Sequence, residues 1–96
     1  MYRAVSEAEF QQLMRTGRFQ IVASSLEGKW FALTAEQARQ WGKARGGNFR
    51  VIEVDIPNEV YSELFSIENL DNIGSAVYAE IEQLDQAIFR GEVKFD

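Results

Sequence analysis

The sequence predicts a compact α+β domain with a largely antiparallel β-sheet, continuous or split, and two main helices. A short strand pattern runs directly into a capped helix start twice, at 2–9 and again at 29–37. Beyond the second helix, most of the remaining chain alternates apolar and polar residues as strands do. The order strand, helix, strand, helix and then strands suits an antiparallel sheet better than a doubly wound parallel one. A chain of 96 residues forms one domain, 1–96.

The first strand and helix are predicted within residues 2–17. Residues 2–5 alternate and are rich in strand formers, and Ser6 follows them. Glu9 lies three places after Ser6, the spacing of a capping box in which a hydroxyl and a carboxylate satisfy free amides of the first helical turn. Apolar residues then recur at helical spacing until Gly17, where the helix is expected to end.

The second unit repeats this arrangement. Residues 19–23 are expected to form an edge strand and residues 24–28 a loop, before a second strand at 30–33. Thr34 and Gln37 have the same capping spacing as the first pair. A second helix is therefore predicted to begin just after Thr34.

This second helix is expected to end near 42–44, before a flexible turn at 46–48. The strongest strand pattern of the chain follows at 49–56, and Pro57 ends it. Phe49 and Val51 lie on one face of this strand, and Ile52, Val54 and Ile56 lie on the other.

The last third of the chain is predicted to consist mostly of strands. We expect a short helix at 59–65, a loop at 68–74 and a strand at 76–81. A connection at 82–86 then leads to a closing strand at 88–95.

The composition excludes several classes of chemistry. The chain contains neither cysteine nor histidine, so disulfides, zinc sites and the usual serine or cysteine nucleophile with a histidine base are absent. Only carboxylates remain as ligands for magnesium or calcium, and no calcium-binding or phosphate-binding loop motif is present. The predicted site therefore contains no metal.

The net charge of -5 makes nucleic acid an unfavourable general partner, because affinity for phosphates requires clustered Lys and Arg. Without an apolar stretch long enough to cross a bilayer, we expect a cytoplasmic protein that has no membrane partner. Five basic residues form either a local patch or an ordinary solvated surface: Arg15, Arg18, Lys43, Arg45 and Arg50.

Glu80 and Glu82 are the first candidates for chemistry. They lie two residues apart in a predicted strand, so a regular strand would direct both to the same face. Neighbouring carboxylates repel, and such a pair lets one group hold a proton while the other stays ionised. The alternative is that both simply face water on an edge strand.

Arg3 and the residues after Gly28 are the other candidates. An arginine directed inward from the first strand would meet a phosphate, a carboxylate or an aromatic face, whereas a surface arginine needs no partner. A glycine lets a ligand approach the backbone, and Trp30 or Phe31 would stack on a heteroaromatic ring. Because Trp30 and Phe31 alternate along the strand, at least one of them belongs to the core.

Four segments carry a family resemblance: YRAVSEAE at 2–9, the run from GKWFA to WG at 28–42, RVIEVDIP at 50–57, and the run at 70–80 that ends in Tyr-Ala-Glu. They resemble small bacterial domains of the ADP-ribosyltransferase-like type. Such domains occur at the C-terminal tips of polymorphic toxins or as short free-standing proteins. The likeness covers nearly the whole chain.

The resemblance implies a split β-sheet that binds NAD, as the substrate, in its cleft. It places Arg3 on the first strand, where it would hold the ribose or the phosphates. It also implies a late catalytic acid, Glu80 or Glu82, with Glu80 preferred because the Tyr-Ala-Glu triplet ends on it. A fixed carboxylate there would stabilise the oxocarbenium ion that forms as nicotinamide leaves.

The second-strand part of the implied site is the run from Phe31 to Thr34. Thr34 either supports the NAD site or only caps its helix. Lys29 and Trp30 would flank the nicotinamide. The resemblance also implies a protein partner, either an acceptor for the ADP-ribosyl group or an immunity protein.

Two alternatives to NAD-dependent ADP-ribosyl transfer or NAD hydrolysis stay open. One is a non-catalytic protein-binding module on the same fold, which predicts that Arg3 and the glutamates do not meet in one cleft. The other is a small ribonuclease toxin that uses Arg, Lys, Tyr and Glu in place of histidine as acid and base groups.

Overall fold

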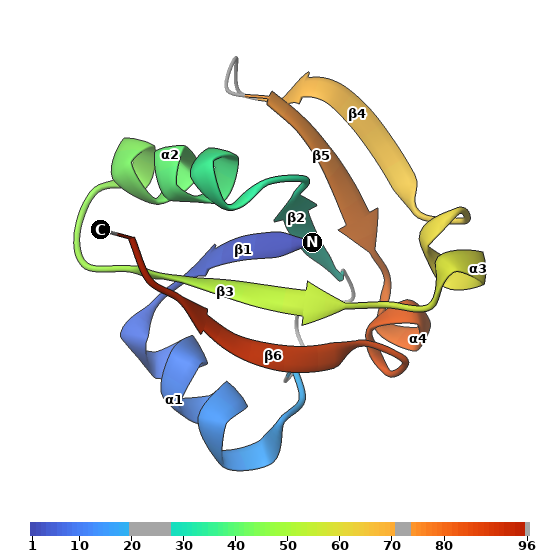
Figure 1. The fold of residues 1–96 in the computed structure, drawn as a ribbon, viewed down its shortest axis with the longest axis horizontal. Coiled ribbons are helices and arrows are strands. Elements are labelled where there is room, and N and C mark those ends of the chain that lie inside the picture. The colour runs from blue at the N-terminus through green and yellow to red at the C-terminus, as the bar shows by residue number, and fades with distance from the viewer. Residues whose placement is uncertain (20–27, 71–73, 96) are drawn as a thin grey trace.

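The computed structural model describes residues 1–19, 28–70 and 74–95. In these ranges the chain forms six strands and four helices (Figure 1). Their order is β1 (Tyr2–Val5), α1 (Glu7–Thr16), β2 (Lys29–Ala32), α2 (Ala35–Arg45), β3 (Arg50–Asp55), α3 (Asn58–Tyr61), β4 (Phe65–Leu70), β5 (Gly74–Ala79), α4 (Ile81–Leu84) and β6 (Ile88–Val93).

The strands form one sheet in the order β4-β5-β2-β1-β3-β6. Every neighbouring pair is antiparallel. The predicted α+β class, with an antiparallel sheet and α1 and α2 as its longest helices, is confirmed. Strands β4 and β6 form the two edges, at opposite sides of the molecule in Figure 1.

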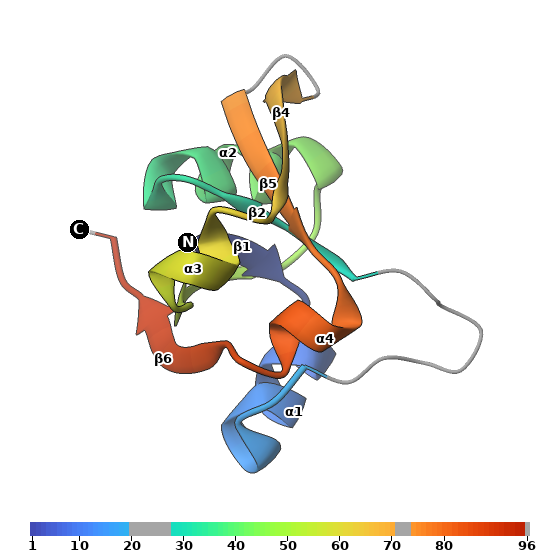
Figure 2. The same cartoon turned by 90° about the vertical axis from the view of Figure 1, so that its right-hand side faces the viewer.

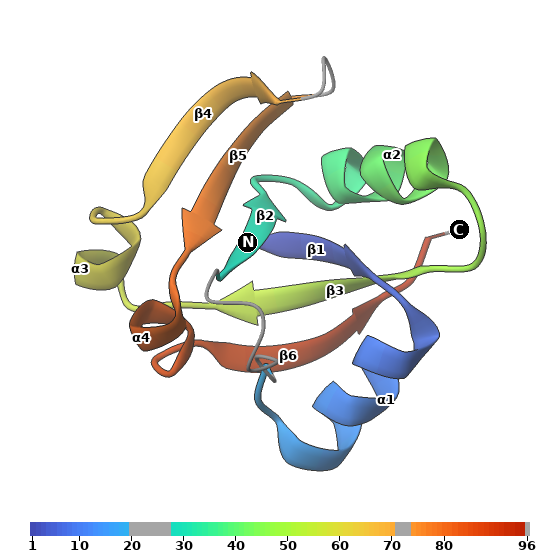
Figure 3. The same cartoon turned by 180° about the vertical axis from the view of Figure 1, so that it is seen from behind.

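The sheet is narrow at its middle. β1 and β2 share a single register pair, Tyr2 with Ala32, whereas β1 pairs with β3 along its whole length and β2 pairs with β5 along its whole length. Figure 3 shows β1 running beside β3 and β6 while β2 turns away with β5 and β4. We call β1, β3 and β6 the β1 half-sheet, and β2, β5 and β4 the β5 half-sheet.

Both long helices begin at the predicted caps. The Ser6 hydroxyl accepts the Glu9 backbone N–H at 3.2 Å, and the Thr34 hydroxyl accepts the Gln37 N–H at 3.2 Å. The first helix ends at Gly17, which has φ of 71° and donates its N–H to the Leu13 carbonyl at 2.7 Å. That left-handed conformation favours glycine, because other side chains are strained there.

Helices cover both faces of the sheet (Figure 2). α1 and α4 lie over the main core, which is centred on the fully buried Phe31. α2 covers the other face with a second, smaller core around Ala32, Ala38 and Val51. Each core joins residues of both half-sheets, so packing across the split holds the two parts together. The main core consists of Val5, Phe10, Leu13, Phe31, Ile52, Val54, Leu64, Val77, Ala79 and Leu84.

Three element predictions need correction. The expected loop at 68–74 is wrong over 68–70 and at Gly74, because these residues belong to β4 and β5. The short helix after Pro57 ends at Tyr61 rather than at 65. Most of the expected strand at 19–23 lies outside the described residues, and Phe19 belongs to no helix or strand. Polar residues in β4 resembled a loop because one side of an edge strand faces water.

Candidate functional site at the split between the half-sheets

Two arginine side chains bond to main-chain carbonyls at the split between β1 and β2. The Arg3 Nη1 donates to the Trp30 carbonyl at 3.0 Å, and the Arg45 Nη2 donates to the Ala4 carbonyl at 2.9 Å. Arg3 lies on β1 and Arg45 at the end of α2. At this position the main-chain carbonyls of Ala4 and Trp30 therefore accept from arginine side chains rather than from N–H groups of the opposite strand.

The register explains why these two carbonyls need partners. Successive residues of a strand direct their backbone groups to opposite sides. Since Tyr2 pairs with Ala32, the next hydrogen-bonded pair of a continuous ladder would be Ala4 with Trp30. Both carbonyls lie largely away from water, where an unpaired oxygen costs about 1 to 3 kcal/mol. The two arginines stabilise the open split by taking the place of the missing ladder.

Arg3 is also held by a carboxylate. Its Nε donates to Glu9 Oε2 at 3.0 Å, and its Nη2 donates to Glu9 Oε1 at 3.4 Å. Only 17% of the Arg3 side chain and 20% of the Glu9 side chain are exposed. Arg3 thus joins β1, the first turn of α1 and β2, and its guanidinium is directed inward as one of the two sequence interpretations expected.

A pocket of about 200 Å³ adjoins the split. It lies between the start of α1 and the end of α2, and it contains both Glu9 and Arg45. Two residues of opposite charge therefore line the same small volume. The lining residues are Ser6, Glu9, Gly42, Arg45, Gly46, Asn48 and Phe49.

The backbone of β2 lies very close to the end of β5. A Cβ atom on Gly28 would lie 1.6 Å from the Ala79 carbonyl oxygen and 2.7 Å from the Glu80 Cα, so only glycine fits. The Gly28 N–H also donates to the Tyr78 hydroxyl at 2.6 Å. Lys29, half-buried, lies opposite Ala79 in the β2–β5 register. This close approach brings Glu80 beside the first residues of β2.

The two aromatic residues of β2 point to opposite faces. Phe31 is fully buried in the main core, with its ring edge-on to Phe19 at 5.5 Å between centroids. Trp30 is half-buried on the other face and lies 5.0 Å from Tyr78 and 6.2 Å from Phe65, again between centroids. The sequence argument that at least one of the pair packs in the core is correct, and Trp30 is the ring with a solvent-facing side.

The geometry predicted for Glu80 and Glu82 is wrong. β5 ends at Ala79, so the two glutamates do not share the face of a strand. The Glu80 N–H donates to Gln83 Oε1 at 2.8 Å and its carbonyl accepts the Leu84 N–H at 2.8 Å, so Glu80 is the residue that caps α4. Glu82 lies inside α4, and both side chains are exposed. The pattern Glu80 to Gln83 has capping spacing, and this local preference overrides the strand pattern.

The predicted site residues thus form two groups. Arg3, Trp30 and Lys29 lie at the split, and Glu80 follows at the neighbouring end of β5. Thr34 is exposed and caps α2. Neither Glu80 nor Glu82 binds Arg3 in the described contacts, which Glu9 and the Trp30 carbonyl occupy.

Three residues of the site were not predicted for it: Glu9, Arg45 and Tyr78. Glu9 was interpreted only as a capping residue, but its carboxylate turns to Arg3 while its backbone N–H binds Ser6. The signal was present in the sequence, since a carboxylate in the first turn of a helix can reach back to a cation on the preceding strand. Arg45 was assigned to a surface patch, and nothing in the sequence indicated its bond to Ala4.

The five basic residues do not act as one free patch. Arg45 bonds to Ala4, and Arg50 is bound by two carboxylates, Glu7 at 2.7 Å and Glu92 at 3.0 Å. Hydrogen bonding to Glu7 raises the pKa of Arg50, and the same bond lowers the pKa of Glu7 below its ordinary value. The Arg50 guanidinium also lies 4.5 Å above the Phe10 ring centroid.

Comparison with protein-family models, with curated proteins and with solved structures finds no match for this chain. No described helix is long and apolar enough to cross a membrane. Over the same described ranges, no three acidic side chains gather closely enough to hold a metal ion. The site must therefore be interpreted from its own residues and from the sequence resemblance.

Proposed function

We propose that this chain acts on NAD, either transferring its ADP-ribosyl group to an acceptor or hydrolysing it, as the sequence resemblance implies. One observation carries the proposal. The sheet opens between β1 and β2, an inward-directed arginine lies at the opening, and an exposed glutamate lies at the adjoining end of β5. The resemblance implies an arginine on the first strand and a late acid for a split-sheet NAD site, and the positions of Arg3 and Glu80 support the proposal in that respect.

Each proposed residue has a definite role. Arg3 pairs with the pyrophosphate of NAD through its planar guanidinium, which matches phosphate oxygens bidentately. To do so it exchanges the Glu9 carboxylate for the phosphate. Trp30 offers a ring face to the nicotinamide or adenine. Lys29 adds a positive charge beside the phosphates.

The reaction needs a carboxylate at the ribose. The bond between ribose C1′ and the nicotinamide nitrogen breaks, and nicotinamide leaves with the bonding electrons. The ribose becomes an oxocarbenium ion, whose charge the Glu80 carboxylate stabilises. A lone pair of water, or of an acceptor side chain on a protein partner, then forms a bond to C1′ and the attacking group loses its proton.

Nicotinamide release from NAD by the purified protein, with and without bacterial lysate, tests this proposal. We expect Glu80→Gln to lower the release rate about 100-fold or more, because it removes the charge with little change in shape. Glu82→Gln is the matched control, since Glu82 is also exposed and lies two residues away. Release that needs lysate indicates transfer to an acceptor, and release without lysate indicates hydrolysis.

A non-catalytic binding module is the second candidate, because Arg3 is already bound by Glu9 and by the Trp30 carbonyl. On this view Arg3 is only a structural bridge. Calorimetric titration with NAD separates the two candidates. Absence of both NAD binding and nicotinamide release would exclude the NAD proposal and favour the binding module. The ribonuclease alternative receives less support, because Arg45 and Arg50 are already bound to other groups.

A further inference from the structure

The outer edge of β4 is open. No strand among the described residues pairs with this side of β4. Backbone groups alternate between the two sides of each strand, and the Tyr2–Ala32 pair fixes this alternation for β2 and, through it, for β5. Phe65 and Ile67 therefore direct their N–H and C=O groups toward β5. Ser66, between them, directs its backbone groups outward. An added strand would find a free donor and a free acceptor there.

This edge lacks the usual protection against strand addition. Two of its side chains are large, apolar and exposed, Phe65 at 63% and Ile67 at 38%. The opposite edge, β6, carries charged residues in ion pairs and is distorted at Gly91, with φ of 115°. Charges and bulges of this kind prevent unwanted pairing. Strand β4 has a single charged residue, Glu68.

A groove of about 360 Å³ runs beside the same edge. Its apolar lining residues include the buried Leu64, Ala76 and Val77, and serines also line it. Leu33 and Tyr61 are also partly exposed at 40% and 39%. The groove can therefore receive alternate side chains of an added strand. The remaining lining residues are Ser62, Ser66, Ile67, Glu68 and Ser75.

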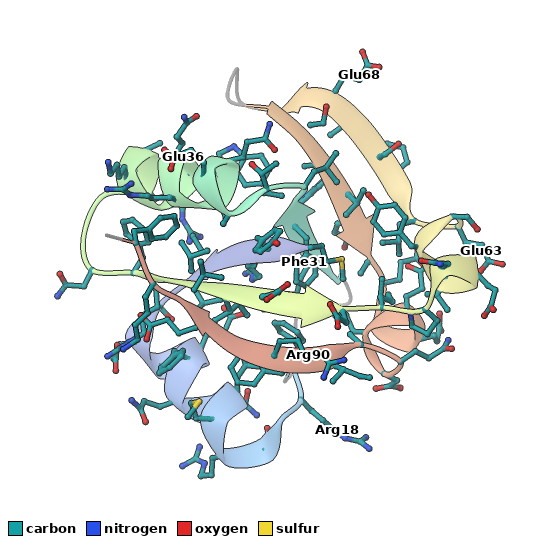
Figure 4. All side chains as sticks on the ribbon, in the orientation of Figure 1. Arg18, Phe31, Glu36, Glu63, Glu68 and Arg90 are labelled. Atoms are coloured by element: carbon teal, nitrogen blue, oxygen red, sulfur yellow. The ribbon has the colours of Figure 1, made fainter. Side chains whose placement is uncertain are left out.

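The stretch of chain that contains α3, β4 and β5 carries only negatively charged side chains. Residues 51–89 contain nine of the fifteen acidic residues and not one lysine or arginine. Glu59, Glu63 and Glu68 are exposed on α3, on β4 and between them. Figure 4 shows Glu63 and Glu68 along the outer side of the molecule, with Arg18 and Arg90 well away from them. A basic partner is attracted to this edge, and an acidic one is repelled.

We propose that the β4 edge binds a basic, extended segment of a partner protein as an additional strand. Backbone hydrogen bonds to Ser66 would set its position, alternate apolar side chains would enter the groove, and lysines or arginines would face Glu63 and Glu68. This proposal does not depend on NAD chemistry. The proposed interaction surface lies on the β5 half-sheet, in which Glu80 directly follows β5.

Fluorescence anisotropy with a short labelled peptide of alternating lysine and valine tests the edge. The matched probe replaces every lysine with glutamate. We expect binding of the basic peptide only, weakening as salt is raised. Ser66→Pro removes the outward N–H but no bond to β5, and it should lower the affinity at least about tenfold. Ser66→Ala keeps the N–H and should bind as the wild type does.

The charge contribution is measured separately. The double variant Glu63→Gln, Glu68→Gln should weaken binding of the basic peptide several-fold and make that binding less dependent on salt. Glu36→Gln on α2 should change neither. Ile67→Lys adds a repelling charge without altering the backbone, so it tests the edge even if Ser66→Pro fails to fold. Glu80→Gln should bind the peptide normally, which separates this proposal from the NAD proposal.

Three results would overturn the inference. Failure of the folded wild type to bind the basic peptide excludes a basic strand as the partner. Equal affinity of the wild type and a folded Ser66→Pro variant means that charge alone attracts the peptide. A stable dimer in sedimentation experiments, abolished by Ser66→Pro, means that a second copy of this chain occupies the edge.

Discussion

The β1 half-sheet and the β5 half-sheet are stabilised by different interactions. Every ion pair of the described residues involves the β1 half-sheet or its two long helices: Arg3–Glu9, Arg39–Glu36, Arg50–Glu7, Arg50–Glu92 and Arg90–Asp55. The β5 half-sheet instead relies on apolar packing and on the contacts of the Trp30 ring, which is edge-on to Phe65 and tilted against Tyr78.

This difference shows how one small sheet can carry two kinds of surface. In the β1 half-sheet most charged residues are in ion pairs, and its outer edge carries such pairs together with a distortion at Gly91. The β5 half-sheet keeps exposed apolar side chains and an open edge, and the exposed Glu63 and Glu68 lie beside or on that edge strand. The split lies where the two parts meet, and Arg3 is the charged residue of β1 that binds the β5 half-sheet directly.

Removing Arg3 should have the largest effect on stability. Arg3→Met leaves the partly buried Glu9 carboxylate and the Trp30 carbonyl without their partner, and we expect a loss of about 2 to 3 kcal/mol in the free energy of unfolding. Urea unfolding measures this loss. Trp30 reports on the β5 half-sheet and Trp41 on the β1 half-sheet, so single-tryptophan backgrounds follow each part separately.

The tryptophan signals also test whether the half-sheets unfold as one unit. In the wild type we expect coincident transitions, because both cores join residues across the split. Arg45→Met is the matched control, because it removes the other arginine at the split. Arg45 is exposed, so this variant should lose less of the free energy of unfolding than Arg3→Met does. A loss below about 0.5 kcal/mol for Arg3→Met, the level of an exposed ion pair, would mean that the split does not depend on this bridge.

Local signals in the sequence were sufficient to predict much of the fold. Ser6 and Thr34 fixed two helix starts because capping depends only on neighbouring residues. The antiparallel arrangement followed from the order of the elements. The β4 strand was missed because Asn and Glu in an edge strand resemble a loop when the pairing partner is unknown.

The candidate site was less predictable because its contacts join distant parts of the chain. The bond between Arg45 and Ala4 spans 41 residues, and that between Gly28 and Tyr78 spans 50. Strand register decides both, and sequence alone did not provide the register. The predicted geometry of Glu80 and Glu82 is wrong for a local reason, because the bond between Glu80 and Gln83 caps α4 and ends the strand before Glu82.

A smaller effect is expected at the protected edge. Gly91 lies in β6 beside the register shift between Glu53 and Val54, with φ of 115°. A Cβ there would meet no atom within 4 Å, so Gly91→Ala costs backbone strain alone, about 1 to 2 kcal/mol. Urea unfolding of this variant should show the loss, while Ser66→Ala on the open edge should change little. Equal stability of the two variants would mean that the distorted edge relaxes freely.

Removing an exposed ion pair of the β1 half-sheet should have the smallest effect on stability, and that effect should depend on pH. The bond to Arg50 lowers the pKa of Glu7 from its ordinary value of 4.5, so the folded protein binds this proton more weakly than the unfolded chain does. The stabilisation is therefore complete above pH 4.5 and is lost as pH falls through the lowered value. The effect is small because both side chains are substantially exposed, where solvent screens the pair.

Thermal unfolding of the wild type and Glu7→Gln across pH measures this contribution. We expect the wild type to have the higher Tm at neutral pH, and the difference to disappear in acid and to shrink in high salt. In an Arg50→Met background, Glu7→Gln should have a smaller pH-dependent effect, because the main cause of the lowered Glu7 pKa is gone and only the bond from Gln11 remains. A difference that persists unchanged into acid would assign the role of Glu7 to packing or to its bond with Gln11, and not to the charge pairing that distinguishes this half-sheet.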